Sequence, residues 1–105
     1  VHCFSGSIEQ AKAVLEKGWL VSFTGIITFK NGESVREAAR AVPVERMMVE
    51  TDCPYISPTP VRNVKPCEPA MVVHTAKKLA EIKGMGLEDF AESVTTTSKR
   101  FFGIE

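Results

Sequence analysis

The sequence has 105 residues, of which 44% are hydrophobic and 25% charged, so it can form one small globular domain with a modest core. Its 13 basic and 13 acidic residues cancel, which excludes a whole-chain electrostatic attraction to nucleic acid or membrane but allows a local basic loop. No run of apolar residues approaches the length of a membrane span, and nothing resembles a signal peptide. We therefore expect a cytoplasmic protein without a membrane partner.

The three cysteines are odd in number and lack C-x-x-C spacing; they are Cys3, Cys53 and Cys67. This pattern favours free thiols in a reducing compartment over a disulfide framework or a zinc site built from cysteines.

The chain opens with a short group, Val1–Phe4, that has the character of the last residues of a strand, and no methionine precedes it. Ser7 and Gln10 then have the spacing of a capping box, which predicts the start of a helix. An apolar face follows at helical spacing, made of Ile8, Ala11, Val14 and Leu15. Gly18 is expected to end this helix.

A second strand is predicted over residues 19–23, and residues 26–32 are expected to form a loop. Ser34 and Glu37 predict a second capping box. The helix that follows has an apolar stripe made of Val35, Ala38, Ala39 and Val42. Pro43 is expected to stop it.

The central segment is Met47–Pro58, in which an apolar run is followed by Glu50 and Asp52. A short apolar run predicts a strand buried on both faces, as in a parallel sheet. Alternation places both carboxylates on one side of this strand, at its carboxyl end. The strand could deliver one or two acids to a functional site, or the acids could simply cap the following turn.

A long, proline-rich loop over residues 53–69 carries Arg62 and Lys65, and loops of this length are usually functional or disordered. A helix is predicted from Pro69 to about Lys83. Its expected buried side consists of Val72, Val73, Ala76, Leu79 and Ala80. A short helix over 87–94, a hydroxyl-rich turn over 95–97 and one more helical turn over 98–102 complete the chain.

The alternation of strands and helices implies three parallel strand segments whose carboxyl ends share one edge. His2 follows the first segment and Asp52 the third, so they would lie roughly 10 Å apart across a flat sheet. A curved barrel wall could bring them closer. An imidazole and a carboxylate suit a divalent metal, although further ligands would be needed.

Two motifs resemble the TatD family of metal-dependent deoxyribonucleases. His2-Cys3-Phe4-Ser5-Gly6 matches the H-C-F-S-G motif of that family, and Glu50-Thr51-Asp52-Cys53-Pro54-Tyr55 matches its E-T-D-x-P-Y motif. The segments 22–29, 62–69 and 100–104 are similar to further parts of the family pattern, so the resemblance covers the whole chain.

The resemblance implies an α/β fold, the C-terminal part of a TIM-type (β/α)8 barrel, with a metal site at the carboxyl ends of the strands. His2 and Asp52 would be metal ligands, and Asp52 would also be catalytic by orienting or deprotonating the attacking water. Glu50 would support these ligands without binding the metal directly. Arg62 and Lys65 are candidates for phosphate contacts. The expected cofactors are divalent ions (Mg, Mn or Zn), two in the complete parent protein.

The family's N-terminal H-x-H pair, central glutamate and further histidine have no counterpart here. We therefore expect residues 1–105 to be a partial barrel domain that needs a missing N-terminal half and is inactive alone. The expected parent is a hydrolase that cleaves phosphodiester bonds in DNA or a related substrate. The alternatives are a non-catalytic half-barrel from a partial gene and a fragment of an amidohydrolase-type barrel.

Overall fold

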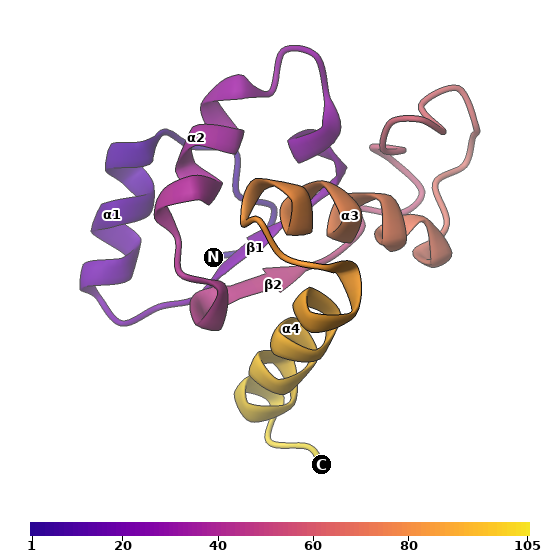
Figure 1. Ribbon diagram of the computed structural model, residues 1–105. Coiled ribbons are helices and arrows are strands. Elements are labelled where there is room, and N and C mark those ends of the chain that lie inside the picture. Colours follow the sequence, from indigo (N-terminus) through magenta and orange to yellow (C-terminus); the bar gives the residue numbers. More distant parts are fainter.

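A computed structural model describes all 105 residues. Two short strands, β1 (Val21–Phe23) and β2 (Met47–Val49), pair in parallel, with Val21 opposite Met47. Helix α2 (Glu33–Ala41) lies in the connection between them, because parallel neighbours need a crossover rather than a tight turn. The predicted parallel arrangement is confirmed, and Figure 1 shows the small sheet at the centre of the surrounding helices.

The expected first strand is wrong in detail, because Val1–Phe4 lies beside β1 without forming a regular strand. The Ser22 amide donates to the Val1 carbonyl at 2.8 Å, and the Phe4 amide donates to the Ser22 carbonyl at 2.9 Å. Between them Cys3 has a φ of 49°, outside the extended region that a strand requires. The structure therefore contains two strands, and an irregular segment hydrogen-bonded along the outer edge of β1.

Helix α1 (Ile8–Glu16) begins and ends as predicted. The Gln10 amide donates to the Ser7 hydroxyl, and the Ser7 amide donates to the side chain of Gln10, which completes the capping box. Gly18 follows the helix with a φ of 77°, a conformation that costs a glycine little.

The second capping box is wrong, because α2 begins at Glu33, directly after Gly32, and has no side-chain cap. Ser34 instead lies within the first turn. Glu33 accepts hydrogen bonds from Arg36 at 2.9 Å and from Arg40 at 3.0 Å, which lower the pKa of its carboxyl group. Glu33 thus pairs with two arginines further along the same helix, while the first backbone amides of α2 receive no side-chain cap.

Short 3₁₀ helices occupy three connections: η1 (Gly25–Thr28), η2 (Val44–Arg46) and η3 (Pro69–Met71). The last leads into α3 (Val72–Ile82). Val73 was expected on the buried side of this helix, but it is 38% exposed, while Ala76, Leu79 and Ala80 are buried as predicted. The long loop between β2 and η3 contains no helix or strand, in agreement with its proline content.

Helix α4 (Leu87–Phe102) is continuous, so the turn expected over residues 95–97 is wrong. Thr97 is 4% exposed, and its hydroxyl donates to the Glu45 carbonyl at 3.2 Å. This tertiary contact offsets the modest helix propensity of three consecutive threonines. No helix in the structure combines the length and apolar character needed to cross a membrane.

The core lies where helices from both halves of the chain cover the sheet (Figure 1). It contains 15 buried residues, and the largest fully buried apolar side chains among them are Phe23, Phe90, Ile27, Met47, Leu79, Val21 and Val42. Phe4 packs edge-on against Phe23, with ring centroids 5.9 Å apart. The irregular N-terminal segment is therefore anchored to β1 by an aromatic contact as well as by its backbone.

Lys83, just after α3, joins that helix to the carboxyl end of α2. Its ammonium lies 2.8 Å from the Val42 carbonyl, 3.1 Å from that of Arg40 and 3.4 Å from that of Ala39. These carbonyls belong to the last turn of α2 and the residue after it. Carbonyls at the end of a helix lack backbone N–H partners in the following turn, and they attract positive charge.

The Lys83→Met variant is expected to unfold more easily, by about 1 kcal/mol, because the carbonyls lose charge-assisted hydrogen bonds but regain water. Urea denaturation followed by circular dichroism measures the difference. Lys77→Met, on an exposed position of α3, is the matched control and should leave the midpoint nearly unchanged. Equal shifts in the two variants would refute a capping role for Lys83.

Candidate metal centre

The carboxyl ends of β1 and β2 meet at one edge of the sheet. β1 ends at Phe23 and β2 at Val49, and the Glu50 amide donates to the Phe23 carbonyl at 3.0 Å, which extends the pairing one residue further. Glu50 therefore follows β2 directly, and Asp52 lies two residues beyond it. The segment containing His2 and Cys3 runs beside β1 at the same edge.

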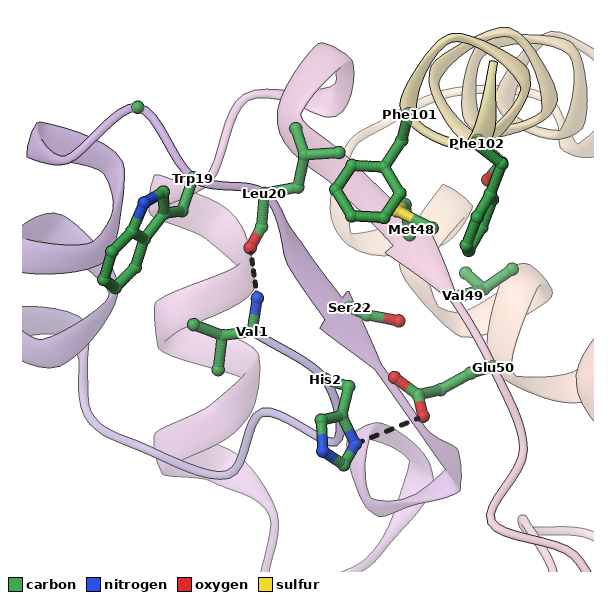
Figure 2. Close-up of a pocket in the computed structure, with 12 residues that line it drawn as sticks. Val1, His2, Trp19, Leu20, Ser22, Met48, Val49, Glu50, Phe101 and Phe102 are labelled. Carbon is green, nitrogen blue, oxygen red and sulfur yellow. Dashed lines mark hydrogen bonds and ion pairs between the residues drawn. The ribbon is translucent and has the colours of Figure 1, made fainter. Parts of the chain in front are cut away.

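Glu50 joins this N-terminal segment to the end of β2. Its Oε2 accepts a hydrogen bond from the Cys3 amide at 2.9 Å, while its Oε1 lies 4.0 Å from Nδ1 of His2 (Figure 2). The His2 side chain is 88% exposed, and the Glu50 side chain is 24% exposed. At 4.0 Å the two atoms are too far apart for a hydrogen bond, so this contact leaves the imidazole available to a ligand.

Asp52 is held by Cys3 rather than by His2. The Cys3 thiol donates to Oδ2 of Asp52 at 3.1 Å and lies 4.0 Å from the Thr24 hydroxyl. Burial raises the pKa of the Cys3 thiol, and its hydrogen bond to Asp52 acts in the same direction, so the thiol keeps its proton at neutral pH. Sequence reasoning did not select Cys3 for the site. Its place beside His2 in H-C-F-S-G was the only available signal.

The predicted residues His2, Glu50 and Asp52 thus lie at one edge, linked through Cys3 and without direct contact between His2 and Asp52. An imidazole and carboxylates suit a divalent metal by their chemistry. However, the structure contains no group of three or more His, Cys, Asp or Glu side chains placed to hold a metal ion. These residues therefore fit part of a metal site, and additional ligands are needed to complete it.

Arg62 and Lys65, the predicted phosphate contacts, line one hollow on the loop that follows β2. The hollow has a volume of about 550 Å³ and is lined by Pro54, Tyr55, Ile56, Ser57, Arg62, Lys65 and Pro66. The guanidinium of Arg62 lies over the ring of Phe29, 4.2 Å from its centroid. This stacking positions the cation while its donors stay exposed to solvent.

A larger cavity of about 690 Å³ opens beside His2 and Glu50 (Figure 2). Its lining includes a set of apolar side chains, which we call the open face: Val1, Trp19, Leu20, Met48, Val49, Phe101 and Phe102. Trp19, Phe101 and Phe102 are between 53% and 63% exposed. Exposed aromatic side chains gathered in this way are typical of a surface that packs against another part of a protein.

Parallel strands covered by helices, with polar side chains at the carboxyl edge, define an α/β protein of the class whose sites lie at that edge. The family model for TatD-related DNase matches residues 1–103. The chain belongs to the TatD family.

Curated relatives agree with this assignment. The chain is 44% identical over 105 residues to an uncharacterized metal-dependent hydrolase of Escherichia coli, YcfH, and spans 39% of its length. It is 39% identical over 104 residues to the uncharacterized metal-dependent hydrolase YabD of Bacillus subtilis, covering 99% of this chain and 40% of the relative. The chain therefore spans about two-fifths of the length of these relatives.

The crystal structure of YJJV, a TatD homologue from E. coli, superposes with a TM-score of 0.90 at 23% identity. The match covers 100% of this chain and 40% of that one. The fold prediction is confirmed: the chain has the fold of the C-terminal part of the TatD TIM-type barrel.

Proposed function

We propose that this chain is the C-terminal part of a metal-dependent hydrolase that cleaves phosphodiester bonds in DNA. The observation that supports this most directly is the placement of His2, Glu50 and Asp52 at the carboxyl edge of parallel strands. Membership of the TatD family and the names of its relatives support a metal-dependent hydrolase. The family's description as DNase-related supports DNA as the substrate.

In this proposal His2 and Asp52 bind divalent ions, two in the complete protein and of the magnesium, manganese or zinc type. Asp52 also orients the attacking water and accepts its proton. Glu50 fixes the Cys3 amide and lies next to the His2 imidazole, so it positions the segment that carries the histidine. When bound, the metal supplies Lewis acidity toward the phosphoryl oxygens.

Arg62 and Lys65 hold the substrate by its phosphates. Both cations line the hollow in the loop after Asp52, and the Arg62 guanidinium lies over the ring of Phe29. Contacts to phosphate fix the register of a nucleic acid without selecting a sequence. The proposed enzyme therefore recognises the DNA backbone more than the identity of its bases.

The proposed partner of the open face is the N-terminal part of a TatD barrel. The exposed aromatic residues of the open face border the same cavity as His2 and Glu50. An N-terminal part packed against this face would therefore lie next to the incomplete metal centre. It would supply the missing ligands while covering apolar surface. Without that partner, we expect only weak binding of Mn²⁺ and no cleavage of DNA.

A chimera tests the proposed function. In E. coli YcfH, the 105 residues that match are replaced by this chain. The chimera is expected to bind Mn²⁺ and to degrade DNA, with unmodified YcfH as the reference. At the same concentration, the isolated chain should bind Mn²⁺ only weakly and leave DNA intact. A folded, metal-loaded chimera that leaves DNA intact would contradict the proposal.

The amidohydrolase-type alternative is tested in the same assay. Cyclic amides and a phosphotriester are offered to the chimera beside DNA. Turnover of an amide or triester without turnover of DNA would favour that alternative over a phosphodiesterase.

A further inference from the structure

Two cysteines face each other across the base of the loop that follows β2. Cys53 and Cys67 are separated by 14 residues, yet their sulfur atoms lie 3.9 Å apart. The Cys67 amide also donates to the Pro54 carbonyl at 2.9 Å. The backbones at the two ends of the loop are thus hydrogen-bonded together where the thiols meet. This geometry does not depend on the proposed hydrolase activity.

The two thiols differ in their access to solvent. Cys53 is exposed, whereas Cys67 is 3% exposed. The Cys53 sulfur lies 2.9 Å from the Thr51 hydroxyl, and the Cys67 sulfur lies behind it, 3.9 Å from the Glu68 carbonyl. An oxidant arriving from solvent therefore meets Cys53 first, with a second thiol already within contact distance.

We propose that Cys53 and Cys67 form an oxidisable dithiol, a modification site that hydroperoxides convert into an intramolecular disulfide. The Cys53 sulfur attacks the peroxide, the O–O bond breaks, one water leaves and a sulfenic acid remains. The Cys67 sulfur then attacks the Cys53 sulfur, the S–S bond forms, and the hydroxyl leaves with the Cys67 proton as a second water. Two thiols and one hydrogen peroxide thus give one disulfide and two waters.

The disulfide requires only a small approach of the two sulfurs. A disulfide bond is about 2 Å long, so the two sulfurs, now 3.9 Å apart, need to approach each other by about 2 Å. Cys3 has no comparable partner, because its thiol is engaged with Asp52 at 3.1 Å. Oxidation is therefore expected to select the Cys53–Cys67 pair over any pairing with Cys3.

The bond would fasten both ends of the loop that carries Arg62 and Lys65, and it would do so one residue after Asp52. Closing a loop restricts the conformations open to it. Oxidation would thereby stiffen the hollow lined by the two cations, and reduction would release it.

The test oxidises the 105-residue chain with a slight excess of hydrogen peroxide and then counts free thiols with Ellman's reagent. We expect one of the three thiols to remain, a monomer lighter by two hydrogens, and a peptide map that links Cys53 to Cys67. Dithiothreitol should restore all three. The Cys3→Ser variant should form the same disulfide.

Two further variants test the order of the steps. Cys67→Ser should stop at a sulfenic acid on Cys53 that dimedone traps, and Cys53→Ser should resist oxidation at Cys67. Since a substitution at the buried Cys67 could disturb folding, Cys3→Ser provides an independent test. If its two remaining thiols stay reduced, or become linked only between molecules, the proposal is overturned.

Discussion

Asp52→Asn is expected to lower DNA cleavage by the YcfH chimera by about 10²–10⁴-fold, the range that a positioned general base contributes. The amide keeps the shape of the carboxylate and can still accept a hydrogen bond from the Cys3 thiol, so the fold should persist. The amide lacks the negative charge with which the carboxylate binds a metal and accepts a proton from water. Steady-state kinetics at saturating Mn²⁺ measure the effect, and calorimetry should show weaker metal binding.

Asp89→Asn is the matched control, because Asp89 is an exposed carboxylate in the first turn of α4. It should leave kcat/KM within about twofold, since a surface substitution away from a site changes little. Unchanged turnover in Asp52→Asn would mean that this carboxylate only shapes the turn after β2. That is the alternative that the sequence left open.

Phe23→Ala is expected to have the largest effect on stability. Phe23 is fully buried in β1 and packs against Phe4, so its removal leaves a cavity between the sheet and the N-terminal segment. Truncations of this kind cost about 3–5 kcal/mol. A domain of this size has a total stability of about 5–15 kcal/mol. Urea denaturation should therefore show a much lower midpoint or an unfolded protein.

Phe102→Ala provides the comparison within one residue type. Phe102 is 63% exposed on the last turn of α4, where it contacts Phe101 edge-on at 5.0 Å. In the isolated chain its loss should cost about 0.5 kcal/mol or less. Similar destabilisation by both substitutions would show that the C-terminal turn of α4 belongs to the core.

The parts of the fold that could be predicted rest on local signals. Ser7 and Gln10 satisfy each other within one helical turn, so their spacing alone fixes the start of α1. The apolar run at Met47 predicts a strand, and β2 forms there. The expected burial on both faces is wrong, because only Met47 is buried, while Met48 and Val49 are partly exposed and line the cavity beside His2. The alternation of such elements then determines the parallel pairing.

The predictions that failed depend on contacts between distant residues. The hydroxyl of Thr97 reaches Glu45, which lies 52 residues earlier, and this bond helps α4 continue through its threonines. The start of α2 moves because Arg36 reaches back to the Ile27 and Phe29 carbonyls as well as to Glu33. Neither of these sets of contacts can be inferred from a short stretch of sequence.

The candidate metal centre was predictable in outline only. Topology alone brings His2, Glu50 and Asp52 to one edge. The thiol contact to Asp52 follows from the unusual backbone of Cys3, and the pairing of Cys53 with Cys67 follows from the path of a loop. Backbone conformations of irregular segments have no periodic signal, so these contacts required the structure.

The irregular segment beside β1 also has a consequence for the order of folding. The Cys3 amide bonds to Glu50 across 47 residues, and the Cys3 thiol to Asp52 across 49, whereas β1, α2 and β2 are near neighbours in the sequence. Closing the longer loop costs more chain entropy, so we expect the strand–helix–strand unit to form first and this edge to join it later. The segment containing Cys3 can therefore open locally while the strand–helix–strand unit stays intact. We expect the Cys3 amide to exchange with deuterium sooner than the amides of β2.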